Sequence, residues 1–187
     1  MDANIDDWAP AVAIPFTSTV NIDAVLAEVV VTLRHEGGRV GGLLQRFGEL
    51  LPNGERSMWL QDVASGALRR IDRPHDPGAT SCLLDADAPA YAACDLRRVA
   101  ESNVDLAVVN RFGKSEAEGR GLRAEIAEVM AAGIPLLIAV RVDLLDAWAS
   151  FLGTPAMLLP PNPQRILAWV RPLVRTRAHA RVIAWPD

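Results

Sequence analysis

Four polar side chains of different chemistry lie between Asn110 and Glu116: an amide, the guanidinium of Arg111, the ammonium of Lys114 and a carboxylate. Arginine offers a planar fork of donors and lysine a point charge, and both bind phosphate-like anions. Lys114 is the only lysine in the chain. This spacing predicts an anion or nucleotide site. The alternative is that Arg111 and Lys114 pair with Glu116 and Glu118 on the surface, which contributes little to stability.

The elements around these residues favour the first interpretation. An apolar run at 104–109 predicts a strand, and the pattern from 116 to 132 predicts a helix ending at Gly133. Ligands in parallel α/β sheets bind at the carboxyl ends of strands, where the polar loop is expected. Two glycines flank Arg120 at the start of this helix. They indicate either close approach of the backbone to a ligand, with Arg120 as a secondary contact, or a plain loop.

The first strand is also followed by a polar turn. Residues 11–16 predict a strand, and apolar positions within 22–33 at three- and four-residue spacing predict a helix that Gly37 ends. Three hydroxyl side chains lie between them, namely Thr17, Ser18 and Thr19. They are candidates for anion binding at the helix N-terminus. The alternative is an ordinary solvated turn in which Thr19 or Asn21 caps the helix.

The next strand supplies two further candidates. The segment 40–46 predicts a strand parallel to the first, and its last residues, Gln45 and Arg46, are expected at the same edge as the central loop. Two short strand-like runs at 56–63 and 67–71, separated by a turn signal, then predict an inserted β-hairpin.

A cysteine and a carboxylate follow another short apolar run. A short strand is predicted at 82–84, with Cys82 as its first residue and Asp85 directly after it, so a nucleophilic thiol or a carboxylate base is one interpretation. No histidine can be placed beside them from the sequence, and a buried structural cysteine is the alternative. The two cysteines of the chain are too few and too unevenly spaced for a zinc site, so we expect no metal and no cofactor.

The remaining patterns complete an α/β order. They predict a helix over 89–101, a buried strand over 135–142 and a short helix capped by Asp143. The C-terminal patterns predict a helix over 164–174 that Pro172 interrupts and an edge strand at 181–185. We expect one domain over residues 1–187, with residues 1–10 as a tail and 154–187 as a less well-defined extension.

Composition limits the classes of function. The formal net charge is −4 and the sequence pI is about 5.4, so there is no global basic field for nucleic-acid binding. The N-terminal residues are acidic and lack a secretory pattern, and no apolar run is long enough to span a membrane. These features predict a cytoplasmic protein with no nucleic-acid or membrane partner.

Several segments resemble a known family. GGLLQR, WLQDVASG, SCLLD, DLAVVNRFGKSEAEGRGLR and GIPLLIAV are similar to the bacterial family called domain of unknown function 2478, and the resemblance covers roughly residues 11–153. The order of elements resembles the small P-loop nucleoside triphosphatases of the cancer-related type. This resemblance implies a mainly parallel, P-loop-NTPase-like three-layer α/β sandwich with an inserted hairpin. It also implies a context of molybdenum transport or nucleotide hydrolysis.

The sequence departs from that resemblance at two positions. A phosphate loop needs GxxxxGK[ST], because its glycines let backbone N–H groups surround the phosphates while the lysine reaches the terminal one. The corresponding stretch here, PFTSTVN, contains neither glycine nor lysine. The resemblance also implies an acidic residue at the end of the central strand. Asn110 stands there instead and is a poor ligand for magnesium. The sequence therefore predicts a degenerate Walker A motif.

Three functions follow from these observations. The first is non-hydrolytic binding of a small anion, either a nucleotide or an oxyanion such as phosphate or molybdate. The second is an atypical nucleoside triphosphatase in which Glu116 or Asp85 acts as the base. The third is a ligand-free interaction protein with apolar patches on the Trp169 helix or at Ile183–Trp185, for which a homodimer is one expected form.

Overall fold

The computed structural model describes residues 11–51, 54–72 and 88–183, of which 181–183 are described by their backbone alone. Its first half consists of β1 (Ala11–Phe16), α1 (Ile22–His35), β2 (Val40–Leu50), β3 (Arg56–Asp62), β4 (Leu68–Arg70) and α2 (Ala88–Glu101). Its second half consists of β5 (Leu106–Phe112), α3 (Lys114–Ala117), α4 (Arg123–Ala131), β6 (Leu136–Arg141), η2 (Val142–Leu144), α5 (Leu145–Leu152), β7 (Met157–Leu158) and α6 (Pro163–Ile183).

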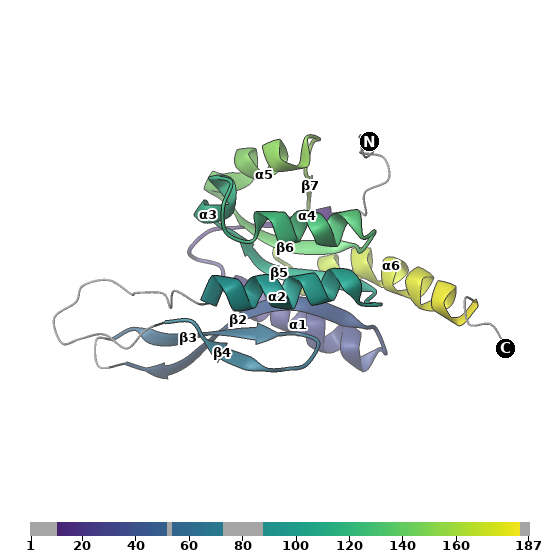
Figure 1. The fold of residues 1–187 in the computed structure, drawn as a ribbon, viewed down its shortest axis with the longest axis horizontal. Helices are drawn as coiled ribbons and strands as arrows, with labels where there is room; N and C mark the ends of the chain where they lie inside the picture. The colour runs from purple at the N-terminus through teal and green to yellow at the C-terminus, as the bar shows by residue number, and fades with distance from the viewer. Residues whose placement is uncertain (1–10, 52–53, 73–87, 184–187) are drawn as a thin grey trace.

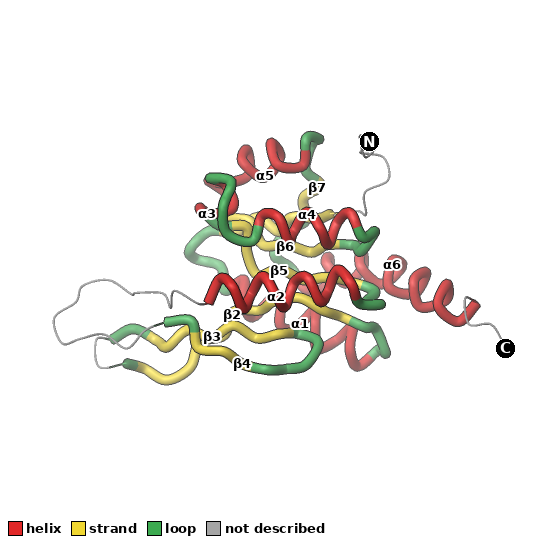
Figure 2. The backbone as a smooth tube through the Cα atoms, in the orientation of Figure 1, coloured by secondary structure: helices red, strands yellow, loops and turns green. Residues whose placement is uncertain are grey.

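The described strands form one sheet in the order β4-β3-β2-β5-β6-β1-β7. The pairs β2–β5, β5–β6, β6–β1 and β1–β7 are parallel. The pairs β2–β3 and β3–β4 are antiparallel. Helices α1 and α6 lie behind the sheet in Figure 1, and α2 and α4 lie in front of it. The same three layers are visible as red helices on both sides of the yellow strands in Figure 2. The predicted mainly parallel α/β sandwich with an inserted hairpin is confirmed.

Two apolar cores hold the layers together, one on each face of the sheet. The buried face of α1 consists of residues at helical spacing, namely Ile22, Leu26, Val29, Val30 and Leu33. The Asn21 side chain accepts a hydrogen bond from the Ala24 backbone N–H and caps this helix. Burial of strand residues on both faces explains why β5 is apolar from Leu106 to Val109 and β6 from Leu136 to Val140.

Close packing of β2 on β5 depends on a glycine. Gly42 has a φ of 117°, and a Cβ built there would lie 1.9 Å from the backbone oxygen of Val108. Only glycine adopts this backbone conformation without strain, and only glycine leaves room for the neighbouring strand.

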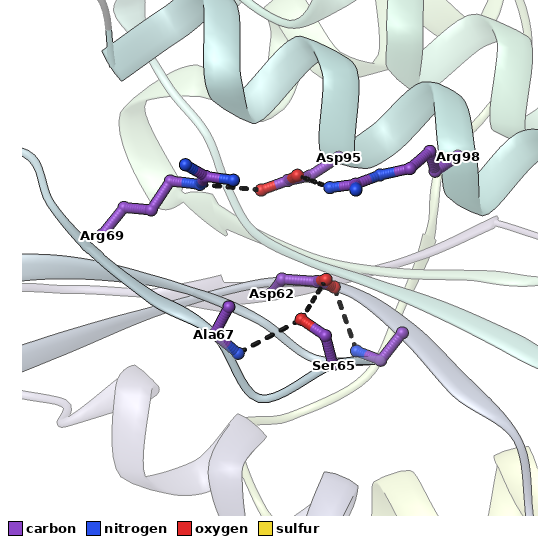
Figure 3. Close-up of polar contacts among 7 residues, drawn as sticks. Asp62, Ser65, Ala67, Arg69, Asp95 and Arg98 are labelled. Atoms are coloured by element: carbon purple, nitrogen blue, oxygen red, sulfur yellow. Dashed lines mark hydrogen bonds and ion pairs between the residues drawn. The ribbon is translucent and has the colours of Figure 1, made fainter.

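Polar contacts hold the inserted hairpin in place (Figure 3). Asp95 of α2 is buried and forms ion pairs with Arg69 of β4, at 3.8 Å, and with Arg98 one turn along the helix. At the β3–β4 turn, Asp62 accepts a 2.6 Å hydrogen bond from the Ser65 hydroxyl. The Arg69–Asp95 pair holds the hairpin beside α2, and the Asp62–Ser65 bond fixes the hairpin turn.

Four predicted details are wrong in the described residues. The helix expected over 116–132 is broken into α3 and α4. The Asp143 side chain caps no helix, because it lies in η2 and bonds Arg141. Helix α6 continues through Pro172 to Ile183, where a strand was expected. The short strand β7 was not expected. Among the described residues, no helix has both the length and the apolar character needed to cross a bilayer.

Tertiary contacts explain why Pro172 does not end α6. The residues Ile166, Val170 and Val174 on both sides of the proline pack into the core against α1. Arg177 also donates hydrogen bonds to the backbone oxygens of Val104, at 3.3 Å, and Gly133, at 2.6 Å. Burial and these bonds offset the hydrogen bond that a proline removes from a helix interior.

Candidate functional site

The carboxyl ends of three neighbouring strands meet at one edge of the sheet. The register pairs Phe16, the last residue of β1, with Arg141, the last residue of β6. Phe112, the last residue of β5, pairs with Val140 of β6. The predicted candidates that follow β1 and those at the end of β5 therefore lie along this edge, next to the start of α1.

A carboxylate from α1 joins two candidates from β5. Asp23, in the first turn of α1, accepts hydrogen bonds from the amide of Asn110 and, at 3.2 Å, from Nη2 of Arg111. Nε of Arg111 donates to the backbone oxygen of Asn110 at 3.0 Å. The guanidinium carbon also lies 5.6 Å from the centre of the Phe16 ring, as in a cation–π contact. Asn110 and Arg111 lie within strand β5 and not in the loop that the sequence predicted.

Asn110 keeps one unused acceptor. Its side chain is buried, with the residue 4% exposed, and its Oδ1 atom has no hydrogen-bond partner among the described residues. A buried polar atom without a partner usually marks an ordered water or a ligand contact. The β5 end therefore presents both a donor group, on Arg111, and an unsatisfied acceptor.

The turn between β1 and α1 is short and exposed. Thr17, Ser18 and Thr19 are all exposed, and the hydroxyls of Thr17 and Thr19 share a 2.8 Å hydrogen bond. The Val20 backbone N–H bonds the Thr17 oxygen at 3.1 Å and closes the turn. The turn therefore connects two elements that both contact Arg111: β1 through the Phe16 ring, and α1 through Asp23.

Glu116 fastens the loop after β5. One carboxylate oxygen accepts a hydrogen bond from the Gly113 backbone N–H at 2.8 Å, and the other accepts from Leu122 at 2.9 Å. Glu116 is only 9% exposed. Gly121 has a φ of 61°, and a Cβ there would lie 2.1 Å from Oε1 of Glu116. The loop wraps around this carboxylate, which explains the break between α3 and α4.

The other charged residues of this loop lie on the surface. Lys114 is exposed at the start of α3 and forms no ion pair with another described residue. Arg120 is exposed and pairs with Glu118. A cavity of about 210 Å³ lies between the loop, the hairpin and α2, but it is lined mainly by apolar side chains and by Glu116. Lys114 and Arg120 are therefore exposed charges, and neither of them lines this cavity.

Gln45 and Arg46 lie inside β2, which continues to Leu50, and not at its end. Because neighbouring strand residues face opposite sides, only Arg46 points toward α1. There it lines a cavity of about 380 Å³ together with Arg34 and His35 of α1. Sequence analysis missed Asp23 and Arg34, since both resemble ordinary polar positions of an amphipathic helix.

The other candidate residues add no side chain to the sites described above. Cys82 and Asp85 fall outside the residues that the structure describes, as does the strand predicted at 82–84. Cys94 is an exposed free thiol on α2. At the end of β6, the hydrogen bond from Arg141 lowers the pKa of the exposed Asp143 carboxyl. No three acidic, histidine or cysteine side chains of the described chain gather as a metal site requires.

Comparison with known proteins places the chain in a family. The family model described as protein of unknown function (DUF2478) matches residues 11–169. The chain belongs to the DUF2478 family. The molybdenum import ATP-binding protein ModC 2 of Bradyrhizobium diazoefficiens is 38% identical to this DUF2478 chain over 159 residues. The match covers 85% of this chain but 18% of that protein, so the chain spans less than a fifth of its relative.

Two solved structures share the fold. The solution structure of a human cancer-related nucleoside triphosphatase superimposes with a TM-score of 0.60 at 15% identity, covering 90% of the DUF2478 chain and 97% of that protein. The crystal structure of THEP1 from Aquifex aeolicus gives a TM-score of 0.54 at 10% identity and the same coverage. The predicted family and the predicted similarity of fold are both confirmed.

Proposed function

We propose that this chain binds a small anionic ligand, either a nucleotide or an oxyanion such as phosphate or molybdate, without hydrolysing it. The observation that carries the proposal is the position of the Arg111 guanidinium beside the start of α1. Nε of this guanidinium donates to the backbone oxygen of Asn110, and Nη2 donates to the carboxylate of Asp23. Nη1 is left for a ligand. The Arg111 side chain is 37% exposed, so the group is both oriented and accessible.

The start of α1 adds to this site. Helix N-termini attract anions through their unpaired N–H groups and dipole, and the Thr17–Thr19 turn places three hydroxyls there. Asp23 occupies part of the same positive region, so an incoming anion competes with this carboxylate for Arg111. Such competition predicts modest affinity and release of the Asp23 contact on binding.

The names of the relatives suggest the ligand. The curated relative is an ATP-binding protein of molybdenum import, and the first structural neighbour is a nucleoside triphosphatase. A nucleotide is therefore the first ligand to test, and molybdate and phosphate are the second. We propose the exposed Lys114 and Arg120 as outer residues that strengthen the local positive field.

Three features support binding without hydrolysis. Residues 15–21 contain neither the glycines nor the lysine of a phosphate loop. Asn110 takes the place of a magnesium-binding carboxylate at the end of β5. Both oxygens of Glu116 already accept backbone hydrogen bonds, so this carboxylate is not poised as a base.

A ligand-free interaction role is the second candidate. Phe47 is 49% exposed and Leu50 is 67% exposed, both at the far end of β2. The family segment also forms a small part of a much longer relative, which is compatible with contacts to other domains. Trp169, by contrast, is partly buried against the α1 core, so it offers less surface than the sequence suggested.

Titration calorimetry with ATP, ADP, phosphate and molybdate, each with and without Mg²⁺, tests the proposal. We expect at least one ligand to bind, with affinity falling about tenfold in Arg111→Gln because a charge-assisted bond is lost. Arg165→Gln, which removes an exposed arginine of α6, is the matched control. Lys114→Ala tests the outer residues and is expected to weaken binding by about twofold.

Two results would contradict the proposal. An absence of binding heat for every ligand favours the interaction role, which size-exclusion chromatography of the same sample then examines. Release of phosphate from ATP, lost in Arg111→Gln but not in Arg165→Gln, favours an atypical hydrolase.

A further inference from the structure

We infer that the chain has a second ligand site, at the opposite end of α1, for an organic anion whose charged group is attached to an apolar or aromatic body. The site is the cavity of about 380 Å³ between the second half of α1 and strands β2 and β3. It goes beyond the proposed function because it shares no residue with the Asp23–Arg111 cluster.

The arrangement of the sheet creates this cavity. The hairpin extends the sheet beyond β2, and α1 lies along the same face (Figure 1). Leu44 of β2 pairs in register with Gln61 of β3, which places both side chains on that face. Val30 and Arg34 of α1 then form the wall above this floor.

The positive charges of the cavity have neutral partners. Nη1 of Arg34 donates to the backbone oxygen of Val63 at 2.6 Å, and Nε of Arg46 donates to Oε1 of Gln61 at 2.8 Å. Neither guanidinium has a carboxylate partner among the described residues, and none of the lining residues is acidic.

Three other arginines of the described chain bind carboxylates instead, although Arg177, like the cavity arginines, donates to backbone oxygens. Arg70 binds the buried Asp72, Arg97 binds Glu125, and Arg171 binds Glu36. A guanidinium held by one neutral acceptor keeps its full charge and most of its five N–H donors. The two cavity arginines are therefore oriented by the protein, and their charges are left for a ligand.

The rest of the lining sets the kind of ligand. The floor and wall include the buried side chains of Val30, Leu44 and Val63, and the imidazole of His35 lies at the rim. A tetrahedral oxyanion alone is too small to fill this volume or to use the apolar surface. A phosphate monoester or carboxylate with an aromatic body fits both the cations and the apolar wall, and pockets for small organic ligands begin at about 300 Å³.

Backbone amide NMR titrations with phenyl phosphate, AMP and benzoate test this site. We expect chemical-shift changes centred on residues 30–35, 44–46 and 61–63. Tighter binding of phenyl phosphate and AMP would indicate a phosphate ester as ligand, and tighter binding of benzoate would indicate a carboxylate. Inorganic phosphate supplies the charge without the body, and adenosine supplies the body without the charge. Both are expected to bind at least tenfold more weakly than AMP.

Three variants and two controls separate this site from the first one. Arg34→Gln and Arg46→Gln are each expected to weaken binding about tenfold, whereas Arg165→Gln removes the same charge from α6 and leaves affinity unchanged. Val31→Phe keeps both arginines but fills the cavity from an exposed position, and should also abolish binding. Arg111→Gln should have no effect here, so failure of the first site does not affect this test.

The inference is overturned if none of the three probes shifts these amides at millimolar concentration. It is also overturned if the shifts persist in Arg34→Gln and Arg46→Gln proteins that retain the wild-type spectrum elsewhere, or if they centre on residues 17–23 and 110–113.

Discussion

Asp23 in the first turn of α1 binds Nη2 of Arg111 at the end of β5, across 3.2 Å and 88 positions of sequence. The chain thus places its own carboxylate at the helix N-terminus, where P-loop proteins hold a phosphate. This contact joins α1 to β5 at the edge of the sheet. It also neutralises part of the positive charge of Arg111 that an anionic ligand needs.

Asp23→Asn is therefore expected to increase the affinity for an anion at this edge. Removing the carboxylate ends its competition for Arg111, and a gain of about threefold to tenfold in phosphate or nucleotide affinity follows from losing one nearby like charge. Calorimetry measures the change. The control is Asp146→Asn, which removes an exposed acid from the first turn of α5. Equal or weaker binding in Asp23→Asn would mean that no anion binds beside Arg111.

Gly121→Ala tests the loop that wraps around Glu116. The positive φ costs about 1–2 kcal/mol for alanine, and displacement of the Glu116 carboxylate adds about 2 kcal/mol. Gly119 is the matched control, because its φ is also positive, at 83°, but an added Cβ would meet no atom within 4 Å. Urea denaturation should show the larger loss for Gly121→Ala. Equal losses would mean that the loop tolerates movement of Glu116.

Glu116→Gln distinguishes a structural carboxylate from a catalytic one. The amide group of glutamine cannot accept both backbone hydrogen bonds, so the free energy of unfolding should fall by about 2 kcal/mol. The exposed Glu118→Gln is expected to change stability by less than about 0.5 kcal/mol. Unchanged stability together with lost phosphate release would reverse this interpretation and assign Glu116 to hydrolysis.

Asp72 gives the stability a defined pH dependence. The hydrogen bond from Arg70 lowers the pKa of this buried carboxyl, and a bond from the Met58 backbone N–H lowers it further. Because the folded pKa lies below the unfolded value of about 3.9, the stabilisation is complete above that pH. It is lost as the pH falls through the folded pKa.

Asp72→Asn should therefore cost about 2–3 kcal/mol at pH 7, and this difference from the wild type should shrink below about pH 4. Denaturation curves at several pH values measure both effects. Glu49→Gln removes the exposed carboxylate 3.6 Å from the same arginine and should change little at any pH. A difference that is constant down to pH 2 would show that the Asp72 charge contributes nothing.

Local patterns in the sequence determined most of the elements. The helical spacing of Ile22 to Leu33 and the apolar runs that became β1, β5 and β6 specify their own secondary structure, because burial follows the period of each element. The turn signal at Ala64–Gly66 likewise gave the hairpin, and the family resemblance gave the fold class. The positions of Asn110 and Arg111 at the sheet edge also followed from the end of an apolar run.

Only the tertiary structure decided how those elements meet. The sequence cannot show that Asp23 binds Arg111, that Glu116 draws the loop around itself, or that Arg34 and Arg46 share a cavity, because each pairing depends on the order and register of the strands. Pro172 makes the same point, since local preference predicts a break and the packing of α6 on α1 keeps the helix continuous. Contacts between distant residues depend on the packing of the whole sheet, which no local pattern specifies.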